Sequence, residues 1–97
     1  MWKLWLDDMR EPDGPGFVVC RFSDEAMAEV SRRGPPRFMA LEFHLGHSDN
    51  VLVFLRWLRE YHASSGQAIP DYSVHSSAPW GRRQVDAFMG EWTGSRR

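Results

Sequence analysis

Two adjacent acids, Asp7 and Asp8, stand directly after the apolar run Trp2 to Leu6. A run of that length and composition predicts a buried strand. Two carboxylates at its end repel each other unless water, an arginine or a metal ion lies between them. Arg10 follows two residues later and could bridge the acids or hold a phosphate through two hydrogen bonds. The pattern indicates a metal or phosphate site, although acids are also common in simple turns.

Polar groups also stand at the ends of two later strand-like runs. Glu42 closes the apolar run that begins at Phe38, and His75 closes the run that begins at Tyr72, with Ser76 directly after it. Parallel strands place their carboxyl ends at one edge of a sheet, where the loops form a crevice. If these strands are parallel neighbours, the polar groups of all three runs meet at that edge.

A divalent cation is one predicted occupant of this edge. Three carboxylates suit a hard cation, which typically keeps several waters and binds a substrate phosphate as well. We therefore expect Asp7, Asp8 and Glu42 to hold Mg²⁺ or Mn²⁺. The HxxH spacing of His44 and His47 suits a softer metal, but the segment is typical of a loop, where two histidines are usually just solvated.

Proton transfer and phosphate binding are the other predicted chemistry. His75 can act as a general acid or base, and Ser76 beside it can position a phosphate oxygen. Arg10 and Arg82 are the candidate phosphate-binding arginines, because Arg82 falls in the first turn of the last helix, where anions are favoured. The alternatives are a structural histidine and solvated arginines. Trp80 could stack a base or simply anchor its loop.

The elements that must position these groups alternate along the chain. Three helical patterns are predicted: one from an N-cap at Ser23 to about Arg33, one over residues 49–62, and one beginning near Pro79. We expect the tail at residues 93–97 to be frayed. The four strand-like runs are Trp2 to Leu6, Phe17 to Phe22, Phe38 to Glu42 and Tyr72 to His75.

An opening strand followed by alternating strands and helices predicts an α/β domain with a mainly parallel sheet. The whole chain of 97 residues is expected to form this one domain. The connection over residues 7–16 is rich in proline and glycine and is short for a parallel crossover. The direction of the second strand therefore stays open, and it is a candidate edge strand.

Composition limits the class of protein. An apolar content of 42%, with 13% aromatic residues, is typical of a folded globule. A net charge of −1 supplies no overall field for double-stranded DNA or an acidic membrane. The sequence shows no signal peptide and no apolar run near the roughly 18 residues of a membrane span. The single cysteine, Cys20, lies in an apolar run, which predicts a buried, inert thiol. We expect a cytoplasmic protein.

Three segments together resemble the cyclic-phosphate processing receiver-like domains, which are small relatives of two-component receiver domains. They are LDDMREP at 6–12, LEFHLG at 41–46 and VHSSAPWGR at 74–82, and the resemblance covers almost the whole chain. It implies a single small receiver-like domain, a truncated flavodoxin-like fold of three layers with about four mainly parallel strands and three helices. It also implies metal-assisted hydrolysis of the cyclic phosphate ends of nucleotides or RNA.

The chain departs from that family in the middle segment. Where the family typically shows Leu-Asp-His-Asp-Leu-Gly, this chain has Glu42, Phe43 and His44 in the three central positions. A glutamate there rarely accepts phosphate, which argues against phosphoryl relay. The alternative to an enzyme is therefore a catalytically impaired receiver-like domain that binds a partner protein. Aromatic residues are enriched at binding hot spots, and the candidates are Trp57, Tyr61, Trp80 and Trp92.

Overall fold

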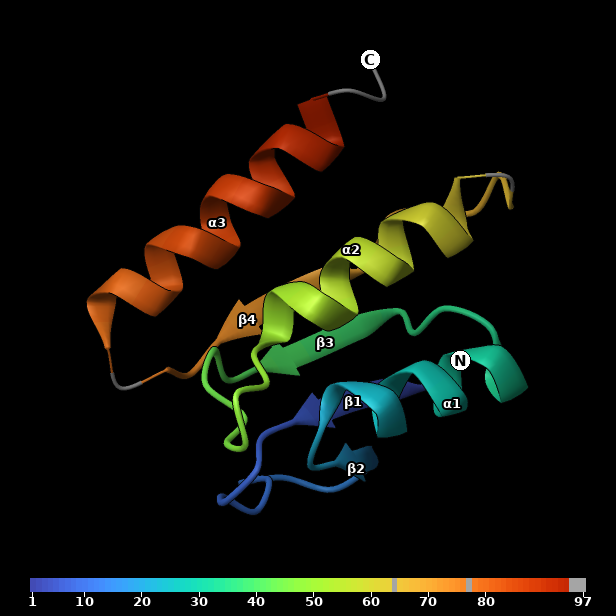
Figure 1. Ribbon diagram of the computed structural model, residues 1–97. Coiled ribbons are helices and arrows are strands. Elements are labelled where there is room, and N and C mark those ends of the chain that lie inside the picture. Colours follow the sequence, from blue (N-terminus) through green and yellow to red (C-terminus); the bar gives the residue numbers. More distant parts are fainter. Residues whose placement is uncertain (64, 77, 95–97) are drawn as a thin grey trace.

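The computed structural model describes residues 1–63, 65–76 and 78–94, which form a four-stranded sheet and three helices (Figure 1). All seven elements fall on segments predicted from the sequence, with small differences at their ends. The strands are β1 (Lys3–Leu6), β2 (Phe17–Cys20), β3 (Phe38–Leu41) and β4 (Asp71–Val74), and the helices are α1 (Ser23–Arg33), α2 (Val51–His62) and α3 (Pro79–Gly94).

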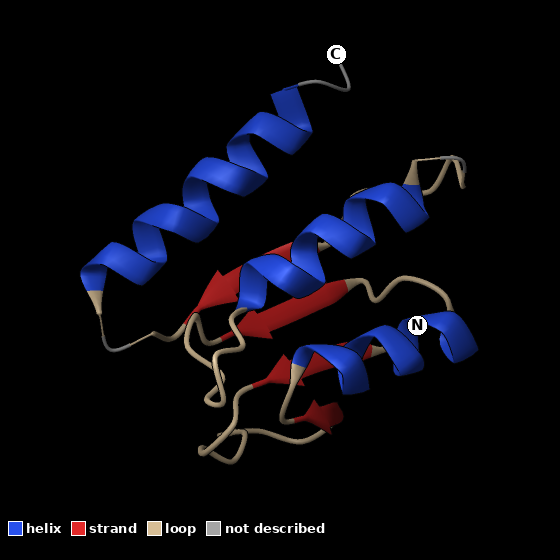
Figure 2. Ribbon diagram, viewed as in Figure 1, coloured by secondary structure: helices blue, strands red, loops and turns tan. Residues whose placement is uncertain are grey.

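The sheet has the strand order β2-β1-β3-β4, and every neighbouring pair is parallel. β2 is therefore parallel to β1 and lies at an edge, which answers the question that the short 7–16 connection left open. The pairing has no stagger at the carboxyl ends: Leu6 pairs with Cys20 and Leu41, and Leu41 pairs with Val74. All four strands consequently end in register, and their arrowheads point the same way in Figure 2.

All three helices cover the same face of the sheet (Figures 1 and 2). Successive strand residues point to opposite faces. Leu4 and Leu6 of β1 belong to one buried apolar cluster with residues of every helix, whereas Trp5, which points the other way, does not. The main core thus lies between the sheet and α1, α2 and α3, and in the described part of the chain no helix is long and apolar enough to span a membrane.

The opposite face is covered in part by the loop at residues 7–16. The indole Nε1 of Trp5 donates to the carbonyl oxygen of Arg10 at 2.9 Å, and Lys3 Nζ donates to the carbonyl oxygen of Pro15 at 3.5 Å. Trp5 is only 7% exposed as a result. The α/β receiver-like fold is confirmed, but the expected third layer is this loop rather than a helix.

The first two helices begin slightly differently from the prediction. Phe22 and not Ser23 is the N-cap of α1, because the carbonyl oxygen of Phe22 accepts from the N–H of Ala26 at 3.2 Å and its own N–H donates to Glu25 Oε1 at 3.2 Å. α2 begins at Val51 and not at residue 49, because the side chain of Asn50 accepts from the backbone N–H of Leu52 at 2.9 Å and caps the helix.

The last helix is longer than expected. α3 continues to Gly94, and Thr93 Oγ1 donates to the carbonyl oxygen of Met89 at 2.9 Å. The frayed tail predicted from residue 93 therefore does not begin there. Residues 95–97 of that tail lie outside the described residues.

Candidate functional site

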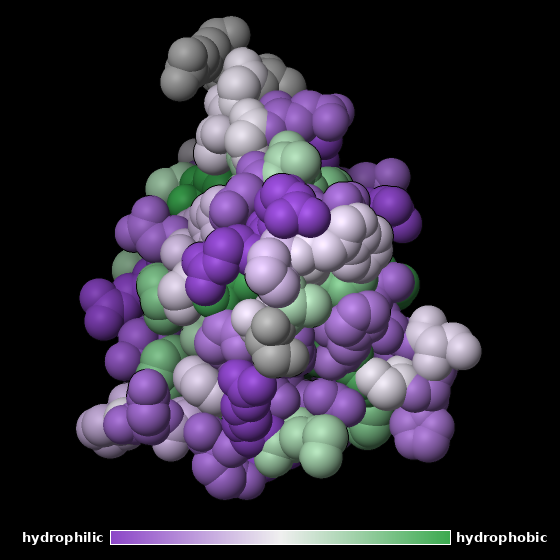
Figure 3. Space-filling model, turned by 90° about the vertical axis from the view of Figure 1, so that its left-hand side faces the viewer, coloured by the Kyte–Doolittle hydropathy of each residue, from purple (hydrophilic) through white to green (hydrophobic). Residues whose placement is uncertain are grey.

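Asp7, Glu42 and His75 lie side by side at the carboxyl edge of the sheet, each one residue beyond its strand. The N–H of Glu42 donates to the carbonyl oxygen of Leu6 at 2.9 Å, and the N–H of His75 donates to that of Leu41 at 2.9 Å. The strands thus bring these three predicted site residues into one row. Figure 3 looks onto this end of the molecule, where hydrophilic side chains gather.

The closest contact in the row joins Asp7 to His75. His75 Nε2 lies 2.9 Å from Asp7 Oδ2, and the side chain of Asp7 is 1% exposed. The other oxygen, Oδ1, accepts from the backbone N–H groups of Met9 at 2.9 Å and Arg10 at 3.0 Å. This local turn, which short acidic side chains favour, fixes the orientation of the carboxylate.

The pKa of Asp7 lies below its ordinary value of 3.8. Burial is the largest single influence and acts to raise the pKa of this carboxyl group. The backbone hydrogen bonds from Arg10 and Met9, together with the charge and the hydrogen bond of His75, outweigh it. Asp7 is therefore ionised at neutral pH in spite of its burial.

His75 is held in one orientation and one tautomer. Its ring stacks on Trp5, with centroids 4.3 Å apart and planes 9° from parallel. Because an ionised carboxylate only accepts hydrogen bonds, Nε2 of a neutral His75 carries the hydrogen that points at Asp7. The other ring nitrogen, Nδ1, then has a free lone pair, and it is buried without a hydrogen-bond partner among the described residues.

The two candidate phosphate-binding arginines flank the end of β4. Arg10 Nη1 donates to the carbonyl oxygen of His75 at 2.8 Å, and Arg82 Nη2 donates to that of Val74. Both arginine side chains are exposed, so the remaining N–H groups of each guanidinium can face a ligand. The structure therefore places both cations beside His75.

Arg21 is a further member of the row that the sequence reading did not single out. Its Nη1 donates to the carbonyl oxygens of Asp7 at 3.0 Å and Arg10 at 2.8 Å, and its Nη2 bonds Glu11. Arg21 directly follows β2, as Asp7 follows β1. The rule that strand ends share an edge could have found it, had the direction of β2 been known.

The predicted metal ligands Asp7, Asp8 and Glu42 are not arranged around a common point. Asp8 Oδ2 lies 3.2 Å from the position that a Cβ atom would take at Gly46, on the loop after β3. Glu42 is 8% exposed, and its Oε2 accepts from the N–H of Phe43 at 2.6 Å. Both oxygens of Asp7 already accept hydrogen bonds.

Among the described residues, no three His, Cys, Asp or Glu side chains are grouped so that they could hold a metal ion. As arranged, Asp7, Asp8 and Glu42 thus do not fit one. The Mg²⁺ or Mn²⁺ ion stays a prediction from the sequence.

Ser76 lies under the first turn of α3. A Cβ atom at Gly81 would come within 3.0 Å of Ser76 Oγ and 2.8 Å of the Cβ of Phe43. The absence of a side chain at Gly81 therefore lets the helix approach both residues. This contact brings the Ser76 hydroxyl to the N-terminal end of a helix, which carries a partial positive charge.

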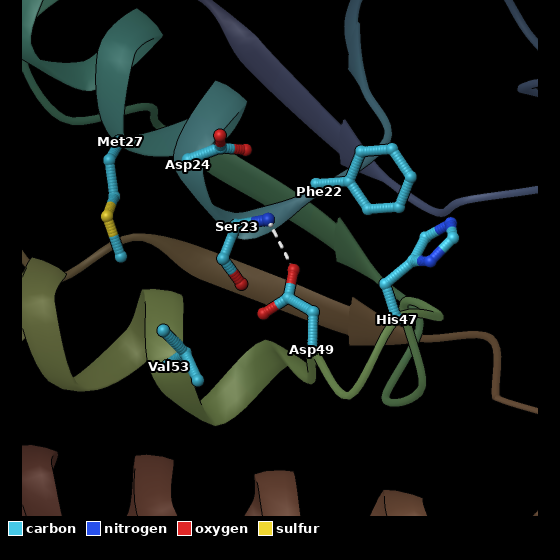
Figure 4. A pocket seen from close by; sticks show the side chains of 7 residues that line it. All are labelled: Phe22, Ser23, Asp24, Met27, His47, Asp49 and Val53. Carbon is cyan, nitrogen blue, oxygen red and sulfur yellow. Dashed lines mark hydrogen bonds between the residues drawn. The ribbon is translucent and has the colours of Figure 1, made fainter.

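A separate hollow of about 510 Å³ opens between the starts of α1 and α2 (Figure 4). In Figure 4 the bond from Ser23 to Asp49 crosses its centre, with Phe22 and His47 on one side of that bond and Met27 and Val53 on the other. His47 of the HxxH spacing lines it, but none of the acids, arginines, His75 or Ser76 predicted for the strand-end site does. We therefore treat it as distinct from the row at the strand ends.

Cys20 is not part of this chemistry. It is 2% exposed at the end of β2, and burial, with Glu25 and Glu29 nearby, raises the pKa of its thiol to about 11. A thiol with so high a pKa is almost entirely protonated at neutral pH and is a poor nucleophile.

Comparison with known proteins gives one match. The sequence profile of a family described as "Cyclic-phosphate processing Receiver domain" matches residues 2–91. No curated protein and no solved structure matches the chain. The match covers every strand and most of α3, and it includes the whole row of strand-end residues.

Proposed function

The chain belongs to the family of cyclic-phosphate processing receiver domains, and from this premise we propose that it hydrolyses the cyclic phosphate ends of nucleotides or RNA. The observation that supports this most strongly is the contact between the buried carboxylate of Asp7 and His75. A histidine held by an ionised carboxylate through one nitrogen is prepared to exchange a proton at the other.

The proposed reaction opens the ring in one displacement with a balanced proton transfer. A water oxygen bonds to phosphorus while its proton passes to Nδ1 of His75, and Asp7 stabilises the imidazolium that forms. The bond from phosphorus to one ribose oxygen breaks, and that oxygen takes the proton from His75. Because Nδ1 is buried, substrate and water must displace the atoms that cover it.

Three other residues supply the phosphate contacts in this proposal. Arg10 and Arg82 lie on either side of the end of β4 and can neutralise the phosphate oxygens. Ser76 and the N-terminal end of α3 add hydrogen-bond donors.

The test is ring opening of nucleoside 2′,3′-cyclic phosphates, followed by ³¹P NMR in parallel samples with Mg²⁺, with Mn²⁺ and with a chelator. We expect His75→Ala to lower the rate about 10²-fold or more, the usual contribution of general acid–base catalysis. His47→Ala is the matched control, because His47 is an exposed loop histidine outside the row, and its rate should equal that of the wild type. Full activity in the His75→Ala protein would refute the assignment.

The alternative, a module that binds a partner protein through an aromatic surface, has less support. Trp92 is 3% exposed and belongs to the core, and Trp57 is half-buried. Tyr61 and Trp80, which are exposed, lie on different helices. The aromatic residues named from the sequence therefore do not form one continuous exposed surface.

A further inference from the structure

Three aromatic side chains contact one another at the carboxyl edge. The rings of His44 and Trp80 are 20° from parallel, with centroids 6.4 Å apart. The ring centroid of Phe43 is 5.0 Å from that of each of the other two rings. The plane of the Phe43 ring lies at 80° to the ring of His44 and at 74° to the ring of Trp80. We call these three residues the aromatic slot, with His44 and Trp80 as its walls and Phe43 as its third side.

The sides of the slot differ in exposure. Phe43 is 4% exposed and packs against Gly81 of α3, which fixes it in place. Trp80 is 49% exposed and His44 is also exposed, so both walls are open to a ligand. A buried aromatic residue that supports two exposed ones gives a surface that can stack a flat ring.

The slot adjoins the residues assigned to the phosphate. Phe43 and Ser76 contact the same point at Gly81, and Arg82 is two residues beyond Trp80 on α3. Phe43 also follows Glu42, a member of the strand-end row. A ligand that combines a flat ring with a phosphate could therefore reach both places at once.

We propose that the aromatic slot binds the nucleobase of a nucleotide whose phosphate lies beside His75. This deepens the proposed function and rests on it. A flat ring between two parallel rings needs about 7 Å, twice the 3.4 Å spacing of stacked bases, and a small movement of the exposed His44 and Trp80 provides it. Stacking accepts any base, so the slot selects for nucleotides over simple phosphate esters without demanding one base.

A cation is the other class of ligand that aromatic residues can enclose. Two features favour the nucleotide. The walls are nearly parallel, which suits a flat group, and Arg82 with the N-terminal end of α3 favours an anion nearby.

The test compares two probes by isothermal titration calorimetry: adenosine 3′-monophosphate, which carries a base, and inorganic phosphate, which does not. We expect Trp80→Ala to weaken binding of the nucleotide by about 5- to 150-fold, the range for loss of one base-stacking contact. Its affinity for inorganic phosphate should not change. Tyr61→Ala, which removes an exposed aromatic residue from α2, is the control and should alter neither affinity.

Three outcomes overturn the slot: no loss with Trp80→Ala, equal loss for both probes, or a loss of the same size with Tyr61→Ala. If Trp80→Ala does not fold, as judged by circular dichroism, His44→Ala is the second variant and should weaken only the nucleotide. Nucleotide binding that depends on Trp80, without hydrolysis of any cyclic phosphate, would overturn the proposed function and support the slot. Hydrolysis that depends on His75 but not on Trp80 would support the proposed function and overturn the proposal for the aromatic slot.

Discussion

Asp7 accepts several of the hydrogen bonds that hold the carboxyl edge together. Its two carboxylate oxygens accept from Met9, Arg10 and His75, and its backbone carbonyl oxygen accepts from Arg21. The charge on the carboxylate strengthens the bonds that it accepts. Its protonation state should therefore affect stability as well as chemistry.

The pH dependence of unfolding should show this directly. The pKa of Asp7 in the folded protein is below the ordinary 3.8, so its carboxylate stabilises the fold fully above that pH. As the pH falls from about 3.8 through the folded pKa, the unfolded chain takes up the proton first and this stabilisation is lost. We expect Asp7→Asn to lower the free energy of unfolding by about 1–3 kcal/mol at pH 6, measured in urea.

The difference between the wild type and Asp7→Asn should shrink below pH 3.8. Asp13→Asn, at an exposed loop position, is the control and should follow the wild type at every pH. A difference of constant size down to pH 2 would show that the charge of Asp7 does not stabilise the fold.

At the residue scale, the sequence predicted which types of residue meet but not how their side chains lie. Asp7, Glu42 and His75 could be placed at one edge because each ends an apolar run. The position of Asp8 beside Gly46 could not be foreseen, because it depends on the turn that the Asp7 side chain makes with Met9 and Arg10. Side-chain direction just after a strand is set by such turns and not by the alternation within the strand.

At the element scale, the start of α3 depends on one glycine. Gly81 lies in the first turn, where its missing side chain gives room to Phe43 and Ser76. Gly90 is in the same helix, and apart from the nearby backbone of that helix and its chain neighbours no atom lies within 4 Å of the place a Cβ would occupy. The two glycines form a matched pair, one packed and one open.

Replacing each by alanine should give opposite results. Alanine is favoured over glycine in a helix interior by about 1 kcal/mol, so Gly90→Ala should stabilise the protein by up to that amount. Gly81→Ala should destabilise it by about 1–3 kcal/mol, because the new methyl group overpacks a tight contact. Urea unfolding measures both, and stabilisation by Gly81→Ala would mean that α3 is free to shift away from Phe43.

Helix and strand positions were predictable because apolar residues recur with the period of each element. The predicted ends of these elements were wrong where a residue from another segment binds the end of the element. Ser23 has a typical N-cap side chain, but its hydroxyl donates to the carbonyl oxygen of Asn50 at 3.1 Å, and the helix begins one residue earlier than predicted. Such long-range contacts override the local preference, and a single sequence contains no signal of them.

At the scale of the whole molecule, the strand order explains why α1 and α2 share a face. Crossovers between parallel strands are right-handed. The connections through α1 and α2 both run toward β4 and so lie on one face, whereas the connection from β1 to β2 runs the other way and lies on the opposite face. That connection has no helix, and the number of layers could not be predicted before the place of β2 was known.

The core between sheet and helices should account for most of the stability. Met39, in the middle of β3, is 0% exposed, whereas Met9 in the loop is 82% exposed. We expect Met39→Ala to reduce the free energy of unfolding by about 2–5 kcal/mol and Met9→Ala by less than about 0.5 kcal/mol, both measured in urea. Equal effects of the two substitutions would contradict this location of the core.

The division of each strand between two faces has a consequence for how such a domain can change over evolutionary time. Leu6, Leu41 and Val74 point to the helices and hold the fold together, while the residue after each of these strands, Asp7, Glu42 or His75, belongs to the row. A mutation in the row can change the polar groups at this edge without removing an apolar residue from between sheet and helices. Natural selection can therefore alter the chemistry of this edge while the scaffold persists.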